Sequence, residues 1–268
     1  VVAQDDVSAA LAAIEGADYA IACGATTSTE GNDRANLDLD QADFLQQLTS
    51  QAAAGTNLVV LMNTPGAVLT PWRDAASVGA IVQMNLAGQA TGLAWADVLL
   101  GRTNPSGKLP VTFPAQESDT VEPCGGDQCD YDERLNVGYR AFDANGVEPA
   151  FAFGHGLSYT TFAYSDVTAS ATKVSVTLKN TGSVAGAEVA QLYIAFPESA
   201  GEPPQQLKGF EKIMLAPGAS KTVEFALSAR DLSVYSEASA GWQRVSGEFG
   251  VRVGSSSRDI RAKTTFTV

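Results

Sequence analysis

The hydrophobic pattern changes partway along the chain, and this change limits the folds open to it. In the first part, three short apolar runs alternate with segments of helical periodicity. These runs are residues 19–23, 58–62 and 79–84. Continuous apolar strands separated by helices are typical of a mainly parallel sheet that is covered on both faces. The sequence therefore predicts a partial α/β sandwich. Its helices are expected over residues 7–15, 41–54 and 88–100.

Apolar and polar residues alternate instead from Ser165 onward. The alternating segments are separated by turn signals such as Asn180-Thr181-Gly182 and Ala216-Pro217-Gly218. Alternation with period two places every second side chain on a buried face, as in an antiparallel sheet. The last hundred or so residues are therefore predicted to form an all-β, immunoglobulin-like sandwich, with no helix beyond a turn near residues 229–233.

The stretch between these two patterns is rich in Pro, Gly and Asp and shows little periodicity. We therefore expect an α/β domain over residues 1–115, an irregular connector over 116–164 and a β sandwich over 165–268. Three strands are few for a stable open parallel sheet, so part of the first domain is expected to be missing from this chain.

Charge narrows the class of partner. The chain has 17 Lys and Arg residues against 30 Asp and Glu residues, which gives a net charge of −13. This balance disfavours nucleic acid or an anionic membrane surface and favours a neutral or cationic ligand. No apolar stretch approaches the roughly 20 residues that span a bilayer, so no membrane insertion is expected.

The three cysteines indicate the redox conditions of the cellular compartment in which the chain is found. Cys124 and Cys129 bracket a short loop, and a four-ligand zinc site there would need two further ligands that are not close in sequence. A disulfide between them is the better interpretation. It implies an oxidising environment and a secreted, extracellular or periplasmic location. Cys23 lies within an apolar run and is interpreted as a small buried hydrophobic residue.

One acidic loop is the main candidate for chemistry. Glu30 is followed by Gly31 just after the carboxyl end of the first predicted strand, where open α/β sheets place their ligands. Asp33 and Arg34 are expected to hold this loop in place. Spacing alone leaves two interpretations open, a catalytic carboxyl group or a solvated acidic loop. The acids Asp38, Asp40 and Asp43 lack the Gly and the final Glu of a calcium loop, so no metal is predicted.

Five aromatic residues could either bind a sugar or pack in the core. A sugar-stacking platform is one interpretation, although each of these residues is individually more typical of a core. The residues are Trp72, Trp95, Tyr131, Tyr139 and Trp242.

Taken together, several segments resemble the C-terminal part of glycoside hydrolase family 3, the β-glucosidase and β-xylosidase family. The resemblance rests on Glu30-Gly31-Asn32-Asp33-Arg34 with Leu37 and Leu39, on residues 101–110 (GRTNPSGKLP), on Val137-Gly138-Tyr139-Arg140, on residues 153–159 (FGHGLSY), and on residues 189–193, 207–210 and 215–218 of the last part.

The resemblance implies three domains: a (β/α)8 barrel with an aspartate nucleophile, an α/β sandwich with the acid/base glutamate, and a fibronectin type III-like domain. Glu30 falls at the acid/base position. The barrel and the first strand of the sandwich have no counterpart in this chain. Family members usually have Pro at the position of Asp40, Gln at that of Asp43 and Gly at that of Arg134.

The resemblance therefore implies the C-terminal portion of a retaining β-glycosidase. Glu30 would act with an aspartate on a barrel-bearing N-terminal chain against a β-linked glucoside or oligosaccharide. The alternative is a non-catalytic carbohydrate-binding, structural or assembly module derived from this family. Neither interpretation requires a cofactor or a metal, and no substrate-binding residue is assigned.

Overall fold

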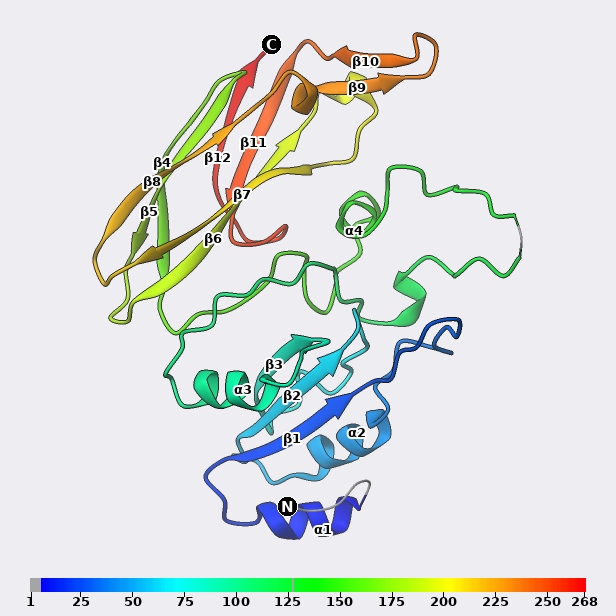
Figure 1. Ribbon diagram of the computed structural model, residues 1–268, viewed down its shortest axis with the longest axis vertical. Helices are drawn as coiled ribbons and strands as arrows, with labels where there is room; N and C mark the ends of the chain where they lie inside the picture. The colour runs from blue at the N-terminus through cyan, green and yellow to red at the C-terminus, as the bar shows by residue number, and fades with distance from the viewer. Residues whose placement is uncertain (1–5, 127) are drawn as a thin grey trace. The chain divides into compact units, whose positions relative to one another are not determined.

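The computed structural model describes residues 6–126 and 128–268 (Figure 1). These residues form two compact units. Residues up to 102 and residues 113–122 form the first unit, whereas residues 103–112 and 123–268 form the second. The chain therefore leaves the first unit, returns to it for ten residues and leaves it again.

The first unit contains a parallel three-stranded sheet and three helices, as the sequence predicts. The strands are β1 (Ala20–Ala25), β2 (Leu58–Thr64) and β3 (Val78–Asn85), in that order across the sheet, and the helices are α1 (Val7–Ile14), α2 (Ala42–Gln51) and α3 (Thr91–Leu99). Asp6 caps α1 by accepting a hydrogen bond from the amide of Ala9. The buried side of α2, which includes Leu45, packs close to Gly24 of β1.

The expectation that these strands are covered on both faces is wrong for two of the three. Only β2 is buried along most of its length. Buried and exposed residues alternate in β1, where Ile21 is 58% exposed, and β3 has no buried residue. Cys23 is exposed rather than buried, because its side chain lies on the same face of β1 as Ile21. Within the described residues, this face of β1 has no covering layer that buries it.

The second unit is an antiparallel β sandwich, which confirms the predicted all-β fold. One sheet has the order β12-β11-β6-β7 and the other the order β4-β5-β8. The strands are β4 (Phe162–Ala169), β5 (Lys173–Asn180), β6 (Gly186–Ala195), β7 (Gln206–Leu215), β8 (Ser220–Ala226), β11 (Glu248–Gly254) and β12 (Ile260–Thr267). Residues 162–268, all of which are described, contain no α-helix. They contain two 3-10 turns, η2 (Glu198–Ala200) and η3 (Arg230–Leu232).

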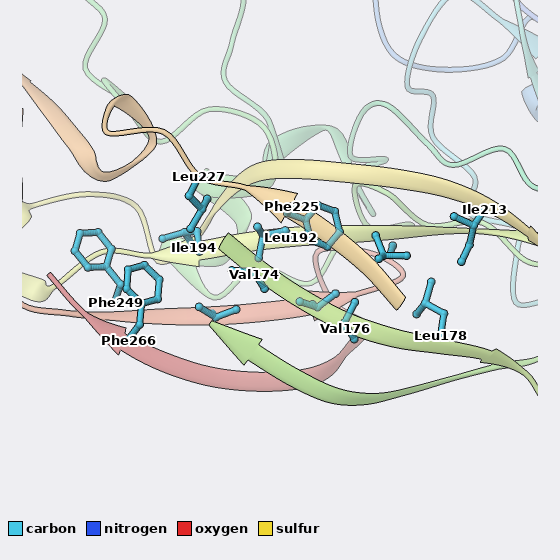
Figure 2. Packing of buried hydrophobic residues seen from close by; sticks show 14 of the residues in the cluster. Val174, Val176, Leu178, Leu192, Ile194, Ile213, Phe225, Leu227, Phe249 and Phe266 are labelled. Carbon is cyan, nitrogen blue, oxygen red and sulfur yellow. The ribbon is translucent and has the colours of Figure 1, made fainter. Parts of the chain in front are cut away.

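The core of the sandwich lies between the two sheets. Figure 2 shows Val174, Val176 and Leu178 of β5 packed with Leu192 and Ile194 of β6. These five side chains are fully buried. Alternate residues of each strand supply this core, which is the reason for the period-two pattern in the sequence. A separate hairpin of β9 (Ser233–Ser236) and β10 (Gly241–Arg244) belongs to neither sheet.

The connecting segments contain more structure than their sequence predicts. A short helix, α4 (Tyr139–Asn145), and a 3-10 turn, η1 (Glu117–Asp119), interrupt the irregular stretch. The hydroxyl of Tyr139 accepts a hydrogen bond of 2.8 Å from the amide of Leu207, and Arg258 pairs with Asp143 at 2.8 Å. These contacts anchor α4 to the sandwich. Cys124 and Cys129 form a disulfide, with their Cα atoms 5.9 Å apart.

Residues 103–112 also pack on the sandwich, and a buried ion pair holds them there. The Nζ atom of Lys108 lies 3.1 Å from Oε1 of Glu188, and the two side chains are 13% and 5% exposed. Lys108 also donates a hydrogen bond of 2.7 Å to the carbonyl of Gly156. The amide of Leu109 bonds to the carbonyl of His155, and its carbonyl accepts from the amide of Gly154. We call residues 103–112 the strap.

Titration of His155 is expected to make the stability of the fold depend on pH. Burial lowers its pKa below the ordinary value of 6.5, and repulsion from Lys108 lowers it further, against an opposing effect of Asp259. As the pH falls, His155 is therefore protonated at a higher pH in the unfolded chain than in the folded chain. The stability that this group contributes is fully present above pH 6.5 and is lost as the pH falls through the folded pKa.

Since His155 is the only histidine of the chain, its titration can be measured directly. We expect the NMR titration midpoint of its ring to lie below 6.5 in the folded chain and near 6.5 in concentrated urea. The melting temperature should fall between about pH 7 and pH 5. The variant His155→Gln, which cannot titrate there, should flatten this dependence. A midpoint at or above 6.5 in the folded chain would contradict the prediction.

No helix among the described residues has the length and apolar character needed to cross a bilayer.

Candidate active site

Glu30 lies at the tip of a tight turn that follows β1. Thr29 and Asn32 form an isolated antiparallel bridge across the turn, so that Glu30 and Gly31 occupy its two central positions. Gly31 has a φ of +76°, a left-handed conformation that glycine adopts without a steric penalty. This explains why Gly follows Glu here. The turn leaves the Glu30 side chain exposed and free of internal hydrogen bonds among the described residues.

Two side chains at the start of α2 hold the beginning of this loop. The Oε1 atom of Gln41 accepts a hydrogen bond of 2.8 Å from the amide of Ala25, and Oδ2 of Asp40 accepts one of 3.2 Å from the amide of Thr27. The amide of Asp40 in turn donates to the carbonyl of Ala25 at 2.9 Å. The carboxyl end of β1 is thus joined to the segment that leads into α2.

Arg34 holds the other end of the loop. Its Nη2 atom donates a hydrogen bond of 2.8 Å to the carbonyl of Asp38, and the carbonyl of Leu37 accepts one of 2.9 Å from the amide of Leu69. Asp33, the second expected support, is exposed, and its carboxylate makes no hydrogen bond or ion pair with any described residue. Of the two side chains named from the sequence, only Arg34 has a bonding role within the loop.

An open pocket of about 1080 Å³ lies beside the loop, at the carboxyl end of β1. Its walls are largely polar and include Arg34, Asp38, Asp40 and Gln41, together with Thr27. Hydrogen-bond donors and acceptors of this kind suit a hydroxylated ligand. Glu30 is not among the residues that line the pocket.

The Glu30 carboxyl group sets the chemistry that we consider for this loop. Glu30 can donate a proton to a leaving oxygen or take one from water. Retaining glycoside hydrolysis needs a second carboxyl group about 5–5.5 Å away to attack the sugar. Among the described residues, no group of three or more His, Cys, Asp or Glu side chains could hold a metal ion.

Comparisons with known families match most of the chain. Residues 2–159 match the model of the glycosyl hydrolase family 3 C-terminal domain, and residues 188–257 match that of a fibronectin type III-like domain. The second match lies within the β sandwich.

Individual proteins match at the level of sequence and of structure. A probable β-glucosidase G of Aspergillus flavus is 40% identical over 90% of this chain and 34% of its own length. A thermostable β-glucosidase B of Acetivibrio thermocellus is 41% identical over 90% of this chain and 33% of its own length. The crystal structure of the β-glucosidase D2-BGL from Chaetomella raphigera superposes with a TM-score of 0.92 at 39% identity, over 98% of this chain and 41% of that protein. The chain therefore spans about a third to two fifths of the length of these relatives.

Proposed function

The chain belongs to glycosyl hydrolase family 3, and from this premise we propose that it is the C-terminal portion of a retaining β-glycosidase of the β-glucosidase type. In this proposal Glu30 is the acid/base residue, and the aspartate nucleophile lies on a barrel outside this chain. The substrate is a terminal β-linked glucoside. The relatives that match over 90% or more of the chain carry β-glucosidase names, which supports this substrate class.

The position of Glu30 on an exposed turn is the observation that carries the proposal. Its carboxyl group stands on an exposed turn at the carboxyl end of β1, and Gln41, Asp40 and Arg34 fasten both ends of that turn. An acid/base residue must reach a bond in a second domain from a backbone that is held in place, and an exposed turn with both ends bonded is compatible with these two requirements.

Each half-reaction gives Glu30 one proton to move. In the first, the protonated carboxyl donates its proton to the glycosidic oxygen while the aspartate attacks the anomeric carbon and the bond to the leaving group breaks. In the second, the Glu30 carboxylate takes a proton from a water molecule, whose oxygen attacks the same carbon and releases the aspartate. Glu30 ends the cycle protonated, as it began.

The uncovered face of β1 supports a partner. Tyr19 and Ile21 are 73% and 58% exposed, and β1 is an edge strand with unpaired backbone groups. Both features favour association with further strands and an apolar surface. We assign this role to the barrel-bearing N-terminal part of the same enzyme.

Two further assignments belong to this proposal. The Cys124–Cys129 disulfide favours an oxidising location, extracellular or periplasmic. We also propose a domain division at residues 1–115, 116–164 and 165–268, in which residues 103–112 are the part of the first segment that packs with the sandwich.

The proposal predicts complementation. Mixing this chain with the barrel-bearing polypeptide of the same enzyme should produce hydrolysis of an aryl β-glucoside, whereas each polypeptide alone should be inactive. Size-exclusion chromatography of the mixture reports whether the two associate. Activity of this chain alone would contradict the division of the two carboxyl groups. A stable complex without activity would instead identify a non-catalytic module.

A further inference from the structure

The structure separates the aromatic residues that the sequence leaves as a possible sugar platform. Trp72 is buried, and Trp95 and Tyr139 are half-buried. Tyr139 stacks on Phe153 with ring centroids 4.7 Å apart, so its ring is part of the packing. Trp242 is 48% exposed, and it is the only one of the five that lies beside a second exposed aromatic residue on a paired strand.

That neighbour is Tyr235, which is 54% exposed. Trp242 of β10 lies directly opposite Tyr235 of β9 in the antiparallel register, so both side chains stand on one face of the hairpin. Their ring centroids are 5.5 Å apart at an interplanar angle of 65°. Figure 1 shows β9 and β10 as a hairpin at one end of the sandwich, apart from its two sheets.

Arg230 fixes the orientation of the indole. Its guanidinium carbon lies 3.5 Å from the centroid of the Trp242 ring, which is a close cation–π contact. A guanidinium at this distance covers one face of the ring and restrains its rotation. Since nearly half of the Trp242 side chain remains exposed, an ordered aromatic surface faces solvent.

Tyr and Trp are enriched at interfaces because each combines an apolar ring with a polar group. A glucose ring with β-linkages carries its hydroxyl groups equatorially, so both of its faces present only C–H groups and can stack on an indole. Its equatorial hydroxyls can accept hydrogen bonds from the guanidinium of Arg230. The net charge of −13 disfavours an anionic chain, and the Arg230 guanidinium beside Trp242 disfavours a cationic one, which leaves a neutral chain.

We propose that the β9–β10 hairpin is a binding site for a neutral β-linked glucan, with Trp242 and Tyr235 stacking on sugar rings and Arg230 orienting the indole. This site lies in the β sandwich and does not use Glu30. Its failure would therefore leave the proposed catalytic role untouched.

Titration of the chain with cellotetraose, followed by ¹H–¹⁵N NMR, tests the proposal. The chain has three tryptophans, and the Trp242→Phe variant identifies the indole resonance of Trp242. We expect that resonance and the hairpin amides to shift in a saturable way, with the other two indole resonances unchanged. Trp242→Ala should lower the association constant by about tenfold, as truncation of a central aromatic contact does, and Arg230→Gln should lower it by a smaller factor.

A matched control is available in Tyr131→Ala, which removes an aromatic side chain that is 77% exposed and lies outside the hairpin. This variant should bind as the unmodified chain does. Circular dichroism and the melting temperature check that each variant is folded, which is expected because Trp242 lies outside the core. Mannotetraose, whose C2 hydroxyl is axial, should bind more weakly than cellotetraose.

Absence of a shift at saturating cellotetraose would overturn the proposal. Unchanged binding by Trp242→Ala, or an equal loss in Tyr131→Ala, would overturn it as well. Equal or tighter binding of mannotetraose would overturn the assignment to a glucan.

Discussion

Replacement of Glu30 by glutamine is expected to lower the turnover of a β-glucoside by the complete enzyme by about 10²–10⁴-fold. Glutamine keeps the shape of the side chain but cannot give a proton to the leaving oxygen or take one from water. The fold should be unaffected, because Glu30 is exposed and makes no internal bond among the described residues. The measurement is the rate of hydrolysis by the assembled enzyme with saturating substrate.

The leaving group gives this prediction a specific signature. A substrate whose leaving group needs no proton should form the glycosyl intermediate in Glu30→Gln, and added azide should then restore part of the turnover by attacking the anomeric carbon without a general base. Glu15→Gln, which alters another exposed glutamate of the same unit, should keep full activity. Unchanged activity in Glu30→Gln would remove the catalytic role.

Replacement of Lys108 by methionine is expected to lower the free energy of unfolding of the chain by about 3–5 kcal/mol. The change leaves the Glu188 carboxylate in a site where it is 5% exposed, without the ammonium that lies 3.1 Å away. A buried charge without a partner is one of the few changes that destabilise a domain this strongly. Urea denaturation measures the effect.

Two controls separate the lost partner from the lost lysine. In the double variant Lys108→Met/Glu188→Leu no charge remains buried, so most of the stability should return. Lys173→Met removes one partner of an exposed pair, in which Lys173 lies 2.7 Å from Glu224, and should cost about 1 kcal/mol or less. Equal losses from Lys108→Met and Lys173→Met would contradict the distinction between the two pairs.

The helices and strands of the fold could be predicted from the sequence because the hydrophobic patterns that indicate them are local. The strand and helix positions of the first unit and the alternation in the sandwich both follow from residue periodicity. The exposure of β1 could not be predicted in this way, since an apolar run such as that around Ile21 does not reveal whether both faces are covered. The helix α4 was also hidden, because its seven residues are too short for a periodic signal and long-range bonds to Leu207 and Arg258 stabilise it.

The site shows the same division between local and long-range information. The turn at Glu30 and Gly31 can be recognised from adjacent residues. The supports Asp40 and Gln41 cannot, because their bonds to Thr27 and Ala25 form only when the start of α2 lies against the end of β1. At the position of Asp40 the family resemblance implies a proline, which has no side-chain acceptor for the amide of Thr27. Arg134 has a φ of +49°, which lies in the left-handed region that favours glycine, the residue that the resemblance implies there.

The chain alternates between its two units along the sequence, and this alternation has an evolutionary consequence. The strap, residues 103–112, is encoded between two stretches of the α/β unit, yet it belongs to the sandwich. A recombination event that moved residues 123–268 into another gene would leave behind Lys108 and Asn104, and with them the partners of Glu188 and of the carbonyl of Ala185. The sandwich is therefore not a transferable cassette. An exchange of residues 103–268 would keep the strap with its partners, but it would remove residues 113–122 from the first unit. Exchanges that carry both units together disrupt neither, so the two units are expected to be inherited as one block.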